Sequence, residues 1–434
     1  MLRNILLGVG IFAALFSVLI FSGKLPIGNN SADTPQGEVV IWGTIPEDAM
    51  SGIIQAFNPQ AKTYRVTYKE INQNNFEQKL LEGLAGGTGP DMIIAPHQII
   101  LSEASRLYQF PITLFSKKAF NDTYINGASI VMTPTGALAL PVAVDPMVLF
   151  YNRTLLSRAG ITNPPDNWDD LALMAQKLSI LNNNTNQFVQ SAVNLGSPTD
   201  PYSKDVIMAI VNQIGQVPVL QQFNSDGSSY FNVLANTPIT ESSDVLPLET
   251  AARFVSQFSD PTKTTYSWNQ FTGNADDQFV AEKLAMYIGY YSELNSLENR
   301  NPRADFAMTF LPQIKGYKTL STGAHMYFIG TLKSTKNLNA SLAVESQFAS
   351  AGVSPAIASA INAVPALRNY GNTPGLDEVV ARSMGVAYVW YDNFYNKSTN
   401  LISIMLSDII NNRYNISDAA NMFVGRLQDL YSPN

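Results

Sequence analysis

Two short apolar runs stand next to each other at Leu138–Val144 and Met147–Tyr151, with Asp145-Pro146 between them. Both runs have the length and the β-branched or aromatic content that are typical of strands. Proline has no N–H for a ladder, so the pattern predicts two strands rather than a single continuous one. We interpret this segment as a crossover that carries the chain from one lobe into a second.

The apolar periodicity before this segment predicts alternating strands and helices. Strands are expected at Glu38–Thr44, Tyr64–Ile71 and Met92–Ala95, and helices at Glu47–Phe57 and Asn75–Leu84. Alternation of this kind predicts a parallel α/β sheet. Ligands bind such sheets at the carboxyl ends of the strands, which correspond here to Gly43–Asp48 and Ala95–Gln98.

Polar residues mark the helix starts that follow the crossover. Asn152 is the predicted N-cap of a short helix that ends before Gly160, and Asn167 is the predicted N-cap of the next helix. Further strands are expected at Leu284–Ile288, Phe306–Leu311 and Gly323–Gly330, and further helices at Lys204–Ile214, Leu248–Phe258, Leu376–Tyr395 and Ile402–Leu430.

The N-terminal segment is different in character. Ile5–Phe21 contains no charged residue and, as a helix, would span most of a hydrocarbon core of about 30 Å. The pattern therefore predicts that residues 1–23 are either a cleaved signal peptide or an uncleaved membrane anchor. It predicts that residues 24–37 are a polar linker. A lipid-modified cysteine is excluded because the chain has no cysteine.

Composition limits the classes of function. A chain of 434 residues with 46% hydrophobic and 14% charged residues predicts two folded domains. A net charge of -7 argues against nucleic acid as a partner. With two histidines and no cysteine, a multi-histidine or thiolate metal site is excluded, and no cofactor is expected.

Four local patterns resemble the extracellular solute-binding proteins of family 1, the sugar-binding components of ABC importers. They are Val40-Ile41-Trp42, the turn and strand Gly87–Ile93, the run from Leu140 through Pro164-Pro165 to Trp168, and Phe279–Gly289. The resemblance implies a two-lobe α/β fold of the periplasmic-binding-protein type with a crossover hinge, preceded by the N-terminal hydrophobic helix. It implies that residues 38–141 and 285–322 form lobe 1, and that residues 142–284 and 323–434 form lobe 2.

Sugar recognition needs flat aromatic rings and planar polar side chains, and the chain offers six candidates for such a cleft. Trp42 could stack on a ligand or fill one face of the sheet, and Asp145 could bind hydroxyls or cap the proline turn. Tyr290 and Tyr291 occupy the position where the family commonly has tryptophan after glycine. His325 and Tyr327 point to one face of a strand. His97 is expected at the surface.

The sequence contains no Gly-x-Ser-x-Gly, no phosphate-binding glycine-rich loop ending in Lys-Ser/Thr and no His-Glu-x-x-His, so no enzymatic activity is expected. We expect capture of a small polar solute, most simply a sugar or oligosaccharide, by a monomer on the outer face of the cytoplasmic membrane. Closure of the lobes would then deliver the solute to an ABC permease. The alternatives are a surface-anchored adhesion or scaffold protein of the same fold and an extracellular glycoside hydrolase.

Overall fold

The computed structural model describes residues 37–432 except 62, 183, 226–227 and 270. The predicted N-terminal helix and all but the last residue of the predicted linker lie outside these residues. Within the described part of the chain, no helix combines the length and the apolar character needed to cross a bilayer.

Three parallel strands begin the fold, as the alternating pattern predicted. β1 (Glu38–Gly43) lies between β2 (Arg65–Glu70) and β3 (Met92–Pro96), with α2 (Glu47–Phe57) and α3 (Phe76–Ala85) as the connecting helices. The boundaries match the predicted ones to within two residues. β3 then pairs on its other side with the antiparallel strand β13 (Thr322–Thr331).

The segment that was predicted as two strands is one continuous strand, β6 (Leu140–Asn152), so this prediction was wrong. Its first half, up to Pro146, pairs with β13, and its second half, from Met147, pairs with β11 (Leu284–Tyr290) and β12 (Phe306–Phe310). Pro146 therefore falls where the strand changes partners. The missing N–H of Pro146 is tolerated there because pairing with β13 ends and pairing with β11 and β12 begins at this point.

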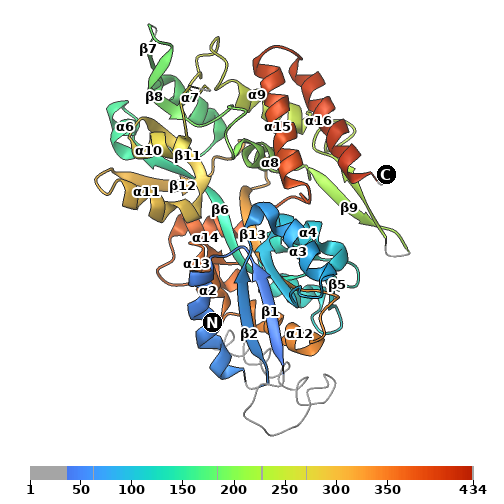
Figure 1. Ribbon diagram of the computed structural model, residues 1–434. Helices are drawn as coiled ribbons and strands as arrows, with labels where there is room; N and C mark the ends of the chain where they lie inside the picture. The colour runs from blue at the N-terminus through green and yellow to red at the C-terminus, as the bar shows by residue number, and fades with distance from the viewer. Residues whose placement is uncertain (1–36, 62, 183, 226–227, 270, 433–434) are drawn as a thin grey trace.

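Apart from β15 (Ala387–Tyr388), which pairs with the start of β13, and short 3₁₀ helices, the remaining elements fall into two groups, shown in the lower and upper parts of Figure 1. The lower group is α4 (His97–Ser102), β4 (Phe110–Pro111), α5 (Lys117–Thr123), β5 (Gly136–Ala137), α12 (Leu338–Phe348), α13 (Ser354–Ala360), β14 (Val364–Pro365) and α14 (Glu378–Gly385). The upper group is α6 (Arg153–Arg158), α7 (Trp168–Leu178), β7 (Ile180–Asn182), β8 (Gln187–Val193), α8 (Ser203–Ile214), β9 (Val219–Phe223), β10 (Ser229–Val233), α9 (Pro247–Ser256), α10 (Ala275–Val280), α11 (Leu294–Arg300), α15 (Tyr395–Ile410) and α16 (Ile416–Tyr431).

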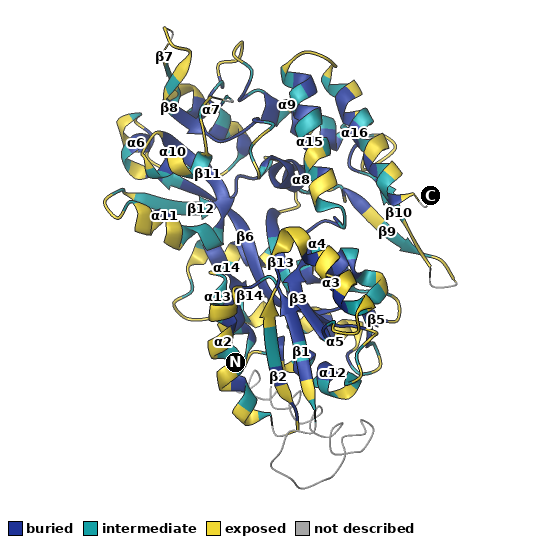
Figure 2. Ribbon diagram, viewed as in Figure 1, coloured by how far each residue is buried: buried dark blue, intermediate teal, exposed yellow. Residues whose placement is uncertain are grey.

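Separate hydrophobic cores define the two lobes. Lobe 1 has one large core, to which β6 contributes residues up to Val144, and lobe 2 has cores on both faces of β6 and β11, to which β6 contributes from Met147 onward. Figure 2 shows the strands that connect the lobes, β6 and β13, as buried along most of their length. The chain therefore passes between lobes inside its most buried strand.

These cores divide the chain differently from the predicted boundaries. Residues 285–322, assigned to lobe 1 by the resemblance, include β11 and β12, which pair with the lobe 2 half of β6. β13 and α12–α14, assigned to lobe 2, pack in the core of lobe 1. Apart from Leu101 of α4, which packs in the core of lobe 2, the described part of the chain changes core at three places: between Val144 and Met147, between Leu311 and Ala324, and between Val389 and Trp390.

A buried carboxyl in lobe 1 links the stability of the fold to pH. Glu345 on α12 has no exposed surface, accepts a hydrogen bond from the Thr331 hydroxyl at 2.7 Å, and has no partner for Oε1 among the described residues. Burial raises its pKa from 4.5 to about 8. Between these values the folded chain holds a proton that the unfolded chain has lost.

The free energy of unfolding should therefore fall as pH rises from about 4.5 to about 8, with this one carboxyl contributing at most about 1.4 kcal/mol per pH unit. In Glu345→Gln the free energy of unfolding should fall less steeply with pH than in the wild type. Urea unfolding at pH 5, 6, 7 and 8 measures both slopes. Glu378→Gln, an exposed position on α14, is the matched control. Equal slopes in the wild type and Glu345→Gln would contradict the prediction.

Candidate functional site

Three of the predicted site residues meet where β6 and β13 pass between the lobes and where β11 ends. His325 on β13 is paired across the ladder with Asp145 on β6, and directly opposite residues in an antiparallel pair have neighbouring side chains. The ring of His325 is stacked on that of Tyr290, with centroids 4.1 Å apart and an interplanar angle of 19°. Three residues that were named separately as candidates for a ligand cleft therefore lie together in the structure.

Lobe 2 supplies further polar groups through the start of α8. The Tyr290 hydroxyl donates to Asp205 Oδ2 at 2.8 Å, and His325 Nε2 lies 3.8 Å from the same oxygen. The neighbouring Lys204 is almost completely buried and donates to Asp392 Oδ2 at 2.6 Å. Its ammonium also lies 3.5 Å from the ring centroid of Tyr395, where the ring face attracts a cation.

The carboxyl groups of the site share a poorly solvated environment. Burial raises the pKa of Asp145 to about 7, although the Ser292 N–H, which donates to Asp145 Oδ1 at 2.9 Å, acts in the opposite direction. Burial also raises the pKa of Asp200, which accepts the Tyr202 N–H just before α8, to about 7. Burial lowers the pKa of His325, and the charge of Lys204 acts in the same direction while Asp205 opposes it. The site can thus change its protonation near neutral pH.

A carboxylate behind Tyr290 holds the end of β11. Glu293 accepts the Tyr290 N–H at 2.8 Å and the hydroxyls of Tyr202 and Tyr287, each at 2.9 Å. This approach needs Gly289, because a Cβ there would lie 2.3 Å from Glu293 Oε2. The Gly289 motif therefore has a packing reason: it lets Glu293 fix the position from which Tyr290 reaches His325.

The three other predicted site residues are Tyr327, Tyr291 and Trp42, and their surroundings differ. Tyr327 is two residues from His325 on the same face of β13, and burial followed by the charge of Asp145 raises its pKa to about 12. Tyr291 packs against the core of lobe 1. Trp42 is buried in that core and is not brought to the centre, because its ring lies directly over Gly83 of α3.

His97 was expected at the surface, and this prediction was wrong. It is 3% exposed and its ring centroid lies 6.2 Å from that of His325, because β13 covers the end of β3. Lys204, Asp205 and Asp392 also lie at this site, and the sequence patterns did not predict them. One signal was available: a lysine and an aspartate open a helix whose next six residues are all apolar, and charges in such a helix are rarely buried without partners.

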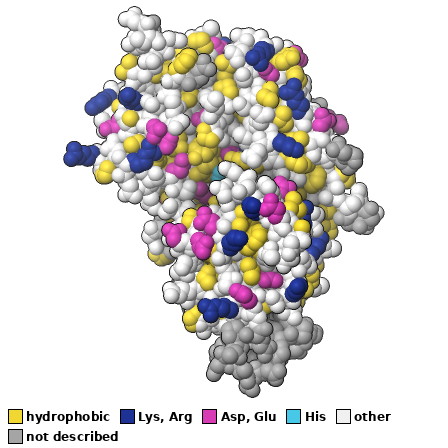
Figure 3. All heavy atoms as spheres, in the orientation of Figure 1, with side chains coloured by type: hydrophobic (Ala, Val, Ile, Leu, Met, Phe, Trp, Pro, Cys, Tyr) yellow, Lys and Arg dark blue, Asp and Glu magenta, His cyan; other side chains and the backbone are white. Residues whose placement is uncertain are grey.

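The assembled site combines aromatic rings with hydrogen-bonding groups from both lobes. His97 and His325 come from lobe 1, Tyr290 and Asp205 from lobe 2, and Asp145 from the crossover itself. In Figure 3 the histidine colour shows at the junction between the two lobes. Carboxylates, imidazoles and tyrosine rings at such a junction can bind a polar solute that contacts both lobes.

Solved structures share this architecture. The cyclic α-maltosyl-1,6-maltose binding protein of Arthrobacter globiformis superposes with a TM-score of 0.72 at 15% identity, covering 92% of this chain and 99% of that one. The sugar-binding protein MalE of Xanthomonas citri gives 0.72 at 14% identity, covering 91% and 97%. The Thermus thermophilus maltotriose binding protein bound with maltotriose gives 0.64 at 16% identity, covering 91% and 100%. These similarities establish a two-lobe α/β fold of the periplasmic-binding-protein class.

The family follows from the sequence match. The model of the bacterial extracellular solute-binding proteins matches residues 52–374, and the chain belongs to this family of binding proteins. Curated binding proteins of Brucella abortus and Brucella suis are 25% identical over 130 residues. That match spans 29% of this chain and 31% of the length of those relatives.

Proposed function

We propose that this protein captures a small polar solute, most simply a sugar or oligosaccharide, between its two lobes. The observation that supports the proposal best is the contact of His325 with Tyr290 and Asp205, because these groups belong to different lobes and meet beside the buried Asp145. A solute held there contacts both lobes, so binding favours closure over the open arrangement.

The chemistry of the site is suited to a carbohydrate. Tyrosine and histidine rings can cover the apolar face of a pyranose, and carboxylates accept hydrogen bonds from its hydroxyls. The candidate ligand-binding residues are Asp145, Tyr290, Tyr291, His325 and Tyr327, to which the structure adds His97 and Asp205. Trp42 is the weakest candidate because its ring packs in the core of lobe 1. The structural neighbours that are named for maltodextrins support the same class of ligand.

We further propose that the protein works as a monomer on the outer face of the cytoplasmic membrane and passes its solute to an ABC permease without a cofactor. Ile5–Phe21 would serve as the anchor. A mass measurement of the mature N-terminus tests the anchor: a chain that starts after Gly23 would show a cleaved signal instead.

Thermal unfolding with a panel of solutes tests the proposed ligand class. The panel comprises glucose, maltose, maltotriose, glutamate, spermidine and inorganic phosphate. A solute present at a hundred times its Kd stabilises the fold by about 2.7 kcal/mol, which raises Tm by several degrees. We expect this increase with at least one sugar. An increase with spermidine or phosphate alone would exclude the sugar, and no increase with further mono- and oligosaccharides would favour the scaffold alternative.

A further inference from the structure

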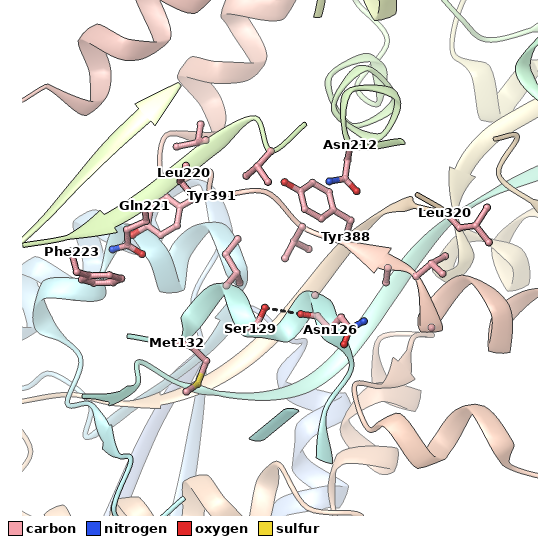
Figure 4. Close-up of a pocket in the computed structure, with 18 residues that line it drawn as sticks. Asn126, Ser129, Met132, Asn212, Leu220, Gln221, Phe223, Leu320, Tyr388 and Tyr391 are labelled. Carbon is pink, nitrogen blue, oxygen red and sulfur yellow. Dashed lines mark hydrogen bonds between the residues drawn. The ribbon is translucent and has the colours of Figure 1, made fainter. Parts of the chain in front are cut away.

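A cavity lies between the lobes, and none of the candidate ligand-binding residues lines it. Its volume is about 470 Å³. The lining comes from lobe 1 at residues 126–132, from lobe 2 at Asn212 and residues 217–223, and from the crossover at residues 385–391. Figure 4 shows Asn126, Ser129 and Met132 on one side, and Asn212, Leu220 and Gln221 on the other.

The cavity lies on the opposite face of β13 from the site described above. His325 and Tyr327 point to one face of this strand, and Met326 between them points to the other. The Met326 Cε atom is 3.1 Å from where a Cβ of the cavity residue Gly127 would stand. Helix α8 connects the two places: Asp205 near its start belongs to the first site, and Asn212 lines the cavity about 10 Å further along the axis.

Several polar groups in this cavity have no partner among the described residues. The side-chain amides of Asn212 and Gln221 and the hydroxyls of Tyr388 and Tyr391 form no hydrogen bond with any described residue. Asn212 is also the one residue of α8 that is not buried. Because the rest of α8 is buried, the Asn212 side chain is the part of this helix that contacts the cavity.

The rest of the lining sets the character of a ligand. No charged side chain of the described residues lines the cavity, and Ile130, Val219 and Leu320 supply apolar walls. Small-molecule pockets commonly pair apolar walls with a few converging polar groups, in volumes of about 300–1,000 Å³. An ionised solute would lose its hydration here without gaining a countercharge.

We propose that this cavity is a second ligand site, for an uncharged solute that combines an apolar ring or chain with an amide or hydroxyl group. The amide or hydroxyl group pairs with Asn212, Gln221 and the tyrosine hydroxyls, and the apolar part fills the space between the lobes. Such a solute contacts both lobes and the crossover, so it stabilises the lobe arrangement described here. The proposal does not depend on which solute the first site binds.

Three molecules of nearly equal shape test whether the cavity prefers an uncharged ligand. Benzamide is neutral, benzoate is an anion and benzamidine is a cation. Binding to the full-length chain is measured by saturation-transfer NMR and by calorimetric titration. We expect saturable binding of benzamide and at least tenfold weaker binding of benzoate and benzamidine. Absence of saturable benzamide binding, or equal binding of the three molecules, would overturn the proposal.

Tyr388→Phe tests the location, because it removes only a hydroxyl that has no partner among the described residues. Its Tm should stay unchanged, and its Kd for benzamide should rise about fivefold, the effect of one lost hydrogen bond. Tyr317→Phe is the matched control, since Tyr317 is 39% exposed and lies outside the lining. An unchanged Kd in Tyr388→Phe would place benzamide elsewhere and overturn the proposed site.

Discussion

Replacing Lys204 by Met should lower the free energy of unfolding by about 3–5 kcal/mol. Lys204 and Asp392 are each 1% exposed, and their side chains are joined at 2.6 Å. The Ser398 hydroxyl also lies 2.8–2.9 Å from both Asp392 oxygens, but it carries no charge. Removing the ammonium therefore leaves Asp392 buried without a countercharge. Urea unfolding at pH 7 measures the loss.

Two further variants make this prediction specific. Lys118→Met removes an ion pair of the same type whose members are 84% and 63% exposed, and it should cost less than about 1 kcal/mol because water screens the pair. In Lys204→Met/Asp392→Asn the uncompensated charge is gone, so much of the lost stability should return. A single variant as stable as Lys118→Met, or a double variant as unstable as the single one, would contradict this account.

The parts of the fold that depend on neighbouring residues were predictable from the sequence. Asn152 accepts the Leu155 N–H and Asn167 accepts the Asp170 N–H, each at 3.0 Å, as the N-cap predictions required. α2 begins and ends at the predicted residues because Pro46 and Asn58-Pro59 bound its apolar pattern. Caps, turns and periodicity act within a few residues, so a single sequence contains the information they need.

The parts that depend on distant partners were not predictable. Whether Pro146 interrupts β6 depends on what lies opposite it, and those partners, Ala324 and the end of β11, are more than 140 residues away. The division into lobes failed for the same reason, because the pairing of β11 with β6 assigns it to lobe 2. Local pattern thus predicted β1–β3 and β11–β13 but missed β7–β10, and it did not indicate which distant strands are neighbours.

The candidate site shows the same difference. Asp145 and Tyr290 were candidates because each stands in or beside a motif that resembles a known family, and His325 was a candidate because it alternates with Tyr327 along a predicted strand. Lys204 and Asp392 are 188 residues apart, and nothing in either local sequence indicates that they form a pair. The role of Trp42 was left open by its position at a strand end, and Gly83 on α3 decides its burial by leaving room for the ring.

Replacing Asp145 by Asn should weaken binding of the proposed sugar by about 10- to 100-fold at pH 8, but much less at pH 5.5. The pKa of Asp145 is raised by burial to about 7, so its carboxyl is ionised at pH 8 and protonated at pH 5.5. A hydrogen bond from a solute hydroxyl to a charged group is worth about 1.5–3 kcal/mol, and more than one to a neutral amide. Lowering the pH should therefore bring the wild-type affinity toward that of the variant. Calorimetric titration at both pH values, with the sugar that raises Tm most, measures the difference.

The raised pKa of Asp145 also predicts how the stability of the ligand-free chain depends on pH. This effect is opposite in direction to the effect on sugar affinity. Between about 3.8 and 7 the folded chain keeps the Asp145 proton that the unfolded chain loses, so ionisation at pH 8 destabilises the wild type but not Asp145→Asn. The variant should thus be more stable relative to the wild type at pH 8 than at pH 5.5 while it binds sugar less tightly. Asp429→Asn, an exposed carboxylate on α16, should change neither property. An affinity loss of equal size at both pH values would show that the charge of Asp145 does not contact the solute, and no loss at pH 8 would place the solute away from the crossover.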